Sequence, residues 1–383
     1  MRALSAIAPL LGVLLSAAAA QAAVQGSLTA SLGPGLDTNP SRTVANDAST
    51  LDGYLGLAAT GKLKLTFGEG QQATGRYDVG LRKFFLTNRE DLAVQQAALD
   101  WAMSLGRVVV GAEASGKWWA SVSGSRDYAD LGGDLFLDVA LARQVSLRVL
   151  AGAHGFVYPP AHLGPPDPAA PPVDPKTADA DGAYDWVGPQ GSLALRWQPA
   201  RRHTATLALF GALPYYNGFS RYEGSSEFAN GADGYPVVRR RDAQFGGQVS
   251  YGYRGPVAVQ AGYSYVRINS TSYGEASERH RLWAAASAKL PLRLYASLLA
   301  AYQFIGYPDG VFLSWDLQLL DDESQSSVGA KLGFAVTDEI DLEARYASYW
   351  FELPKVAAPS DPSATLPTTW WRHTAFLGVT LRL

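Results

Sequence analysis

Apolar and polar residues alternate along most of this chain. Between positions 55 and 67 the odd-numbered residues are apolar or small, whereas the even-numbered residues are small or polar and include Lys62 and Lys64. A period of two places the two kinds of residue on opposite faces of a β-strand. The same alternation returns at 73–82, 135–141, 145–154 and 340–346. The pattern therefore predicts a chain of strands, each with one apolar and one mixed or polar face.

Short and long breaks separate these segments in turn. Tight turns are expected near 68–70, 105–107, 142–144, 198–202, 254–256, 290–291 and 337–339, and longer breaks include 33–50, 158–185, 217–237, 307–323 and 351–368. Seven tight turns with eight longer connections predict about 16 strands. The range is 14 to 18, because 312–319 alternates weakly and could belong to a further hairpin. Short turns at one edge and long loops at the other are typical of a transmembrane β-barrel.

Aromatic residues gather near both ends of the expected strands. Near the tight turns lie Phe67, Trp101, Trp197, Tyr251, Tyr253 and Phe334; near the long breaks lie Phe85, Trp118, Trp119, Tyr158, Trp186, Tyr215, Tyr216, Tyr265, Trp350, Trp370 and Trp371. Such rings prefer the boundary between water and lipid. In hydrocarbon every backbone polar group needs a partner, so a sheet must close on itself. The expected fold is all-β: a transmembrane, antiparallel, up-and-down barrel.

The first 22 residues are expected to be a signal peptide. Arg2 precedes an apolar stretch at 6–18, and the small residues Ala20 and Ala22 fit a cleavage site. An N-terminal membrane anchor is the alternative. No later stretch of 18 apolar residues follows. We therefore expect residues 23–383 to form a single barrel domain in the bacterial outer membrane, reached through the periplasm. Its first strand would start at Val24, which leaves no room for an N-terminal plug.

Composition narrows the possible partners. The formal net charge is -3, and only 17% of the residues are charged, against about 25% in soluble domains. This charge excludes the basic surface of a nucleic-acid-binding protein. There is no Cys and there are five His, so neither a cofactor nor a metal site is expected.

The end of the chain resembles a known family. The chain stops within a strand-like segment, 376–383, in which Gly378, Leu381 and Leu383 resemble the terminal assembly signal of bacterial outer-membrane β-barrel proteins of the porin type. That family usually ends in an aromatic residue, and this chain ends in Leu. The segment Asp37-Thr38-Asn39-Pro40 is also similar to one that follows the first strand of many such proteins. The resemblance implies folding by the outer-membrane barrel assembly machinery, with outer-membrane lipid and lipopolysaccharide around the barrel.

A closed barrel of this size would surround water, and the strand alternation identifies the residues facing it. The expected basic residues are Lys62, Lys64, Arg76, Arg82, Lys117, Arg148, Arg196, Arg240, Arg281, Lys289, Arg293, Lys331, Arg345 and Arg382. The expected acidic residues are Asp78, Asp100, Glu113, Asp134, Asp138, Asp242, Asp341 and Glu343. An excess of basic residues would favour anions, and reversing Arg148 and Arg293 would then shift conductance toward cations. Alternatively, these charges pair across strands and leave little net field.

Several aromatic residues share the inward parity: Phe136, Phe210, Trp283, Tyr295, Tyr349 and Phe376. Rings along a polar channel can stack on sugar faces, which indicates carbohydrate passage. The alternative is that they pack against a loop folded into the lumen.

Three functions remain open. The first is a porin-like channel for hydrophilic molecules, anionic or saccharide, of which polysaccharide export with a periplasmic partner is one variant. The second is a structural barrel that anchors an envelope secretion or motility complex. The third is a barrel hydrolase, in which His154, oriented by Asp134, would act as a general base. No serine nucleophile is evident beside this pair, so we expect a protein without enzymatic activity.

Overall fold

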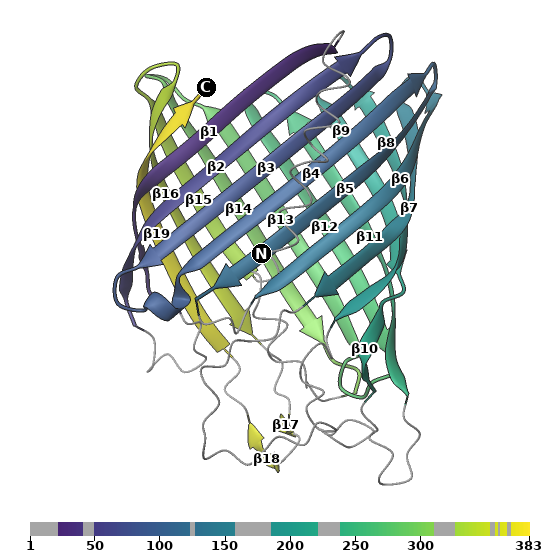
Figure 1. The fold of residues 1–383 in the computed structure, drawn as a ribbon, viewed down its shortest axis with the longest axis vertical. Coiled ribbons are helices and arrows are strands. Elements are labelled where there is room, and N and C mark those ends of the chain that lie inside the picture. The colour runs from purple at the N-terminus through teal and green to yellow at the C-terminus, as the bar shows by residue number, and fades with distance from the viewer. Residues whose placement is uncertain are drawn as a thin grey trace.

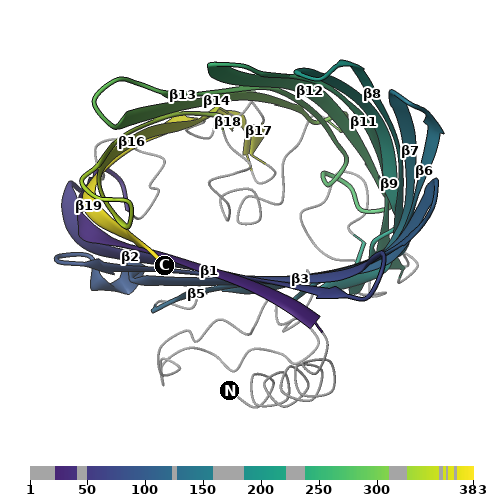
Figure 2. The same ribbon diagram turned by 90° about the horizontal axis from the view of Figure 1, so that it is seen from above.

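The computed structural model describes residues 22–40, 50–122, 127–157, 185–220, 238–309, 326–352, 357–358, 361–365 and 369–383. These residues form one antiparallel sheet that closes into a barrel (Figures 1 and 2). The first half comprises β1 (Ala22–Asp37), β2 (Asp52–Phe67), β3 (Gln71–Phe84), β4 (Leu92–Leu105), β5 (Val108–Ser121), β6 (Tyr128–Ala142), β7 (Val145–Val157) and β8 (Trp186–Ala200). The second half comprises β9 (His203–Ala212), β10 (Tyr215–Phe219), β11 (Arg239–Arg254), β12 (Val257–Ser270), β13 (Ser277–Lys289), β14 (Leu294–Gly306), β15 (Ser326–Ala335), β16 (Ile340–Glu352) and β19 (Thr369–Arg382).

Each strand pairs with its neighbours along the chain, and the last strand, β19, pairs with both β16 and β1. The strands β9 and β10 are two parts of one strand, since both lie between β8 and β11. Pro214 separates them: it has no N–H for the ladder, although its carbonyl still accepts from the Asp242 N–H at 3.0 Å. Sixteen strands therefore form the wall of the barrel, which confirms the expected antiparallel up-and-down fold.

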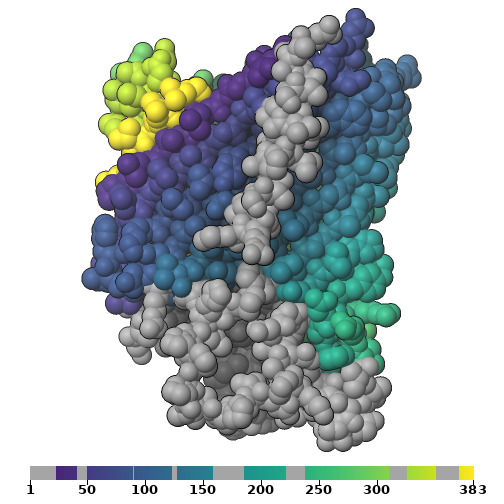
Figure 3. All heavy atoms as spheres, viewed as in Figure 1, coloured from purple at the N-terminus to yellow at the C-terminus, as the bar shows by residue number. Residues whose placement is uncertain are grey.

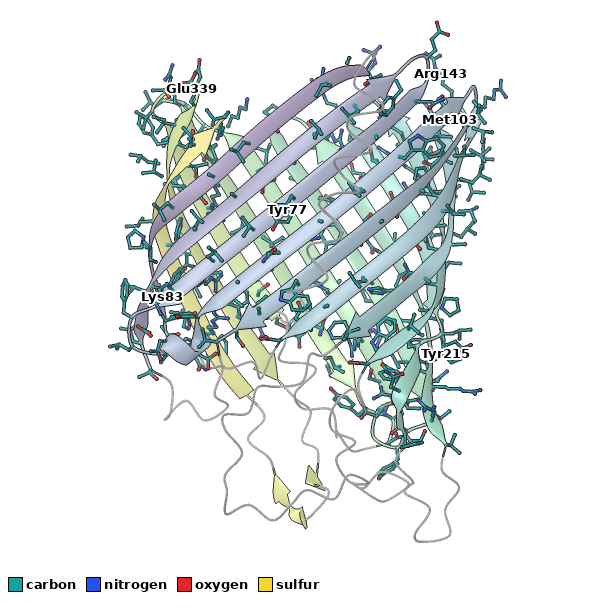
Figure 4. All side chains as sticks on the ribbon, in the orientation of Figure 1. Tyr77, Lys83, Met103, Arg143, Tyr215 and Glu339 are labelled. Carbon is teal, nitrogen blue, oxygen red and sulfur yellow. The ribbon has the colours of Figure 1, made fainter. Side chains whose placement is uncertain are left out.

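The two ends of the barrel differ as expected. All seven predicted tight turns join consecutive strands at one end, here called the turn end, where Met103, Arg143 and Glu339 lie (Figure 4). Lys83 and Tyr215 lie at the opposite end, the loop end (Figure 4). A short 3-10 helix (Asn88–Glu90) lies in one of its loops, and the pair β17 (Ala357–Ala358) and β18 (Asp361–Thr365) lies beyond this end in Figure 1.

The outer face of the wall is apolar and exposed. Figure 3 shows this outer surface over the strands of the first half, coloured purple to teal. Leu28, Leu55 and Leu135 expose 44%, 46% and 69% of their surface, and each alternates with residues of the inner face. This arrangement suits a wall surrounded by lipid. One polar pair interrupts this face near its middle, where the Tyr77 hydroxyl donates to Gln95 Oε1 at 2.8 Å (Figure 4). The Tyr77 hydroxyl and the Gln95 amide oxygen therefore satisfy each other's hydrogen bonding at a depth where lipid would exclude water.

Outward aromatic rings lie near both ends of the barrel. At the turn end Trp101, Trp197 and Tyr251 are exposed, and at the loop end Trp118, Tyr215 and Trp371 are exposed. Three histidines also lie on the outer face: His203, His280 and His373 form hydrogen bonds with the Tyr251, Tyr263 and Tyr346 hydroxyls at 2.6, 2.8 and 2.9 Å. The rings of Tyr158 and Trp370 lie outside the residues whose side chains are described.

Three of the expected belt residues point inward instead. Trp119, Trp186 and Tyr216 belong to a row of rings on the inner face of the loop end, together with Tyr128 and Phe156. Successive ring centroids in this row are 4.9 to 6.5 Å apart. The prediction failed here because it used distance from the loops and neglected parity: Trp118 and Trp119 are neighbours in sequence and necessarily face opposite sides.

The first strand is longer than expected. It begins at Ala22 and ends at Asp37, so Gly33 and Pro34, expected to open a loop, lie inside β1. Gly33 allows β1 to approach β19 closely, because a Cβ at this position would overlap the Leu377 carbonyl oxygen of β19. The weakly alternating segment 312–319 and the expected signal peptide up to residue 21 lie outside the described residues. Within the described ranges, no helix is long and apolar enough to cross a membrane.

Candidate functional site: the barrel lumen

A cavity of about 1030 Å³ lies within the ring of strands, with lining residues on β1–β5, β8, β9, β11–β16 and β19. Its polar lining includes hydroxyl and amide side chains such as Gln96, Thr206 and Gln260. Six charged residues of the described part line it, and all six are basic: Arg82, Lys117, Arg196, Arg254, Lys331 and Arg345. An aqueous space lined by one sign of charge concentrates ions of the opposite sign.

The strand register shows how the sequence produces this lining. Lys62 is paired with Arg76 across β2 and β3, while the pair Leu57 and Leu81, five positions along the same two strands, is exposed on the outer face. The same alternation places the other expected basic residues of the strands, Lys64, Arg82, Lys117, Arg148, Arg196, Arg240, Arg281, Lys289, Lys331, Arg345 and Arg382, on the inner face. Arg293 differs, because it lies in the turn after β13 with a φ of 61° and donates to the Val336 carbonyl at 3.1 Å.

About half of the inward basic residues are neutralised by carboxylates. Arg76 binds Asp78 at 2.7 Å, and Arg148 binds Glu113 at 2.5 Å. The other pairs are Arg240 with Asp242 and Glu275, Lys331 and Arg345 with Glu343, and Arg382 with Asp341. Pairing across strands, one of the two outcomes considered from the sequence, holds for Arg148, Lys331 and Arg382, whereas Arg76, Arg240 and Arg345 pair with a carboxylate two residues away on their own strand.

Five other inward basic residues form no ion pair within the described ranges. Lys62, Lys64, Arg196 and Arg254 are exposed to the lumen, and Arg82 is half-buried with its guanidinium 5.4 Å from the Tyr54 ring centroid. The sequence interpretation missed Arg254 because it assigned this residue to a turn. The parity of β11 would have identified it, since Arg254 lies an even number of residues from Arg240 and Asp242 on the same strand.

The expected inward rings lie over glycines of the next strand. Phe136 lies over Gly111, and Tyr295 over Gly333. A Cβ at Gly246 would come within 2.7 Å of the Phe210 ring, and one at Gly262 within 2.7 Å of Trp283. One side of each ring is thus occupied by backbone, and the Arg148 guanidinium lies 4.2 Å from the Phe136 centroid.

The other two rings differ from each other. Phe376 lies over Gly378 of its own strand and 5.1 Å from the Arg345 guanidinium. Tyr349 lies against no glycine of the described residues, and the Arg372 guanidinium is 5.9 Å from its ring centroid. The five rings that lie over glycines therefore fill space against the wall, which leaves their glycine-backed face unavailable for stacking on a sugar.

His154 pairs with a different carboxylate from the one expected. Its Nε2 contacts Asp130, whereas Asp134 accepts from the Gln190 amide at 2.9 Å. Both carboxylates lie on β6, diagonal to His154 on β7. Gln190 on β8 lies opposite Gly152, which in turn lies opposite Asp134. The arrangement proposed for a general base is therefore not formed. Within the described ranges, no group of three metal-ligating residues is assembled.

The two motifs that resemble outer-membrane barrels lie at opposite ends of the closure seam, where β1 pairs with β19. Arg372 of β19 donates from Nε to both carboxylate oxygens of Asp37, at 3.0 and 2.9 Å, and both side chains are buried. The Asn39 amide donates to the Trp371 carbonyl at 3.2 Å. At the other end, the N–H and C=O of Leu383 pair with those of Leu28, while Leu381 and Leu383 are exposed on the outer face and Gly378 lies beneath Phe376.

Comparisons with known proteins agree with this architecture. No protein-family model matches the sequence, and no curated protein matches it. Among solved structures, the outer-membrane channel DcaP of Acinetobacter baumannii is 12% identical, covers 95% of this chain and 98% of its own, and has a TM-score of 0.51. The chain has the fold of an outer-membrane channel. Pseudomonas putida OprB is 9% identical over 94% of each chain, with a TM-score of 0.49. The porin-type resemblance drawn from the sequence is confirmed for the fold.

Proposed function

We propose that this protein is a channel of the bacterial outer membrane through which hydrophilic anions pass. The observation that carries the proposal is the charged lining of the cavity, which is basic at all six described positions. Such a lumen raises the local concentration of anions and lowers that of cations. The overall net charge of -3 does not act against this, because the wall nearest the path sets the local field.

The basic residues without carboxylate partners decide the selectivity. Paired residues such as Arg148 contribute little net field, whereas Arg82, Arg196 and Arg254 retain their charge toward the water of the lumen. Arg196 on β8 and Arg254 on β11 are separated by one strand, whereas Arg82 on β3 lies in another part of the ring. An anion would therefore meet positive charge from two parts of the wall. Sulfated, phosphorylated or carboxylated small molecules, acidic saccharides included, have this chemistry.

The test is the reversal potential of single channels in a planar bilayer with a salt gradient. The wild-type channel should prefer chloride to potassium, and R196E/R254E should invert that preference. Arg143→Glu, a reversal in an exposed turn outside the lumen (Figure 4), is the matched control and should leave selectivity close to that of the wild type. A correctly folded barrel without conductance would contradict the proposal and favour the structural-anchor alternative. Cation preference in the wild type would also refute it.

A further inference from the structure

The outer face of β11 carries two arginines at the loop end. Arg239 and Arg241 alternate with Arg240 and Asp242, which are buried on the inner face, so both point away from the lumen. Arg241 is paired in register with Tyr215, and Arg239 with Phe219. Figure 4 shows Tyr215 on the outside of the barrel near the loop end.

Their height along the wall places both charges where lipid headgroups would lie. Tyr215 is 46% exposed and belongs to the outward rings of the loop end. Arg241 lies directly beside it, and Arg239 lies two residues further toward the loops. A charged side chain on the lipid face is costly in the hydrocarbon and nearly free of cost at the interface. The two arginines are thus at the depth at which a membrane tolerates them.

Neighbouring groups orient both guanidiniums without neutralising them. The Arg241 guanidinium lies 5.9 Å from the Tyr215 centroid, and that of Arg239 lies 5.8 Å from Phe219. Arg239 also donates to the Asn217 carbonyl at 2.9 Å. Neither forms an ion pair in the described part of the chain. Two other outward basic residues of this end differ, because Arg267 pairs with Glu278 and Lys83 with Asp91.

We propose that Arg239 and Arg241 form a binding site for the phosphate of an anionic outer-leaflet lipid, the phosphorylated glycolipid lipopolysaccharide. Guanidinium groups bind phosphate through paired, charge-assisted hydrogen bonds. Residues two apart on one strand face are about 6.6 Å apart, so both can reach one headgroup. Basic clusters at this depth attract anionic lipids. The inference rests on the proposed outer-membrane location but not on the passage of anions.

The test measures lipid retention by the full-length barrel, folded in detergent and analysed by native mass spectrometry. The probes are lipid A with its phosphates and dephosphorylated lipid A with the same acyl chains. We expect the phosphorylated form to be retained and R239Q/R241Q to bind it about tenfold more weakly, which corresponds to losing about 1.4 kcal/mol. R201Q/R202Q, in an exposed turn at the opposite end, is the matched control and should bind as the wild type does.

Three outcomes would overturn the site: equal retention of both lipid forms by the wild type, equal retention by R239Q/R241Q and the wild type, or displacement of the lipid by an equal concentration of inorganic phosphate. The last result would indicate a site for free anions instead of a lipid. The comparison of the two lipids on the wild type requires no variant, so it also holds if the double variant fails to fold. Ion selectivity measured on the same preparation separates failure of this site from failure of the channel proposal.

Discussion

The closure seam and the cavity wall use the same residue types in opposite ways. At the seam, Arg372 of β19 is buried and donates to both carboxylate oxygens of Asp37 on β1. On the cavity wall, Arg196 and Arg254 face water and have no carboxylate partner in the described ranges. The difference shows that inward parity alone does not assign a role to an arginine. Its neighbours in the wall decide whether its charge is paired with a carboxylate or faces the lumen.

The largest effect is expected at the seam. Asp37→Ala removes one partner of the buried ion pair between Asp37 and Arg372, and breaking such a pair typically costs about 3–5 kcal/mol. The variant should lose the fast-migrating folded form on unheated gels at a lower temperature than the wild type. Asp78→Ala is the matched control: it removes a carboxylate from an ion pair in which Arg76 is 53% exposed, and such pairs contribute about 0–1 kcal/mol. Equal shifts in the two variants would contradict the distinction between seam and wall.

A second substitution should leave two paired basic residues of the cavity without their carboxylate partner. Glu343 neutralises both Lys331 and Arg345, and both of these also line the cavity. Glu343→Gln removes the negative charge and should raise the preference for anions above that of the wild type in reversal-potential measurements. Glu339→Gln, which removes an exposed carboxylate at the turn end, is its control and should leave selectivity unchanged (Figure 4). A decrease in anion preference in E343Q would show that these residues do not face the conducting path.

A third prediction concerns the rings that lie over glycines. Gly246→Val should displace Phe210 and destabilise the barrel by about 1–3 kcal/mol, the usual cost of overpacking. Gly80 also faces the lumen, but no atom lies within 4 Å of where its Cβ would be. Gly80→Val should therefore unfold at the same denaturant concentration as the wild type, or a higher one. If the two substitutions are equally tolerated, the position of the Phe210 ring does not require a glycine at 246.

The smallest effect is expected for the neutral pair on the lipid face. Tyr77→Phe leaves Gln95 without its partner, and measured hydrogen bonds of this kind in membranes average about 0.6 kcal/mol. Urea unfolding in lipid vesicles should show a loss of this order. Tyr302→Phe provides the comparison, because Tyr302 is also an exposed outward tyrosine and its hydroxyl forms no hydrogen bond within the described residues. A loss as large as that of Asp37→Ala would mean that polar pairing on the outer face matters as much as the buried seam.

Much of the barrel could be predicted from the chain because its signals are local. Alternation with period two, the seven turns and the two sets of outward rings need only neighbouring residues, and they led to the correct strand number. The errors arose where a local rule was applied without parity or contact. Trp119, Trp186 and Tyr216 were assigned to the lipid face although they point inward, and Gly33 was expected to begin a loop although it allows two strands to approach.

The sequence by itself determined which side of the wall each charged residue faces, because successive side chains in a strand must point in opposite directions. Only the tertiary structure decided which charges meet. Asp37 and Arg372 are 335 positions apart in the chain. His154 contacts Asp130 and not Asp134, although both carboxylates lie diagonal to it. Strand register, strand tilt and closure of the barrel determine which charged side chains come into contact, and none of these can be predicted from a short stretch of residues. The lining of the lumen is therefore predictable as a set of residues, whereas its net charge depends on pairing across strands.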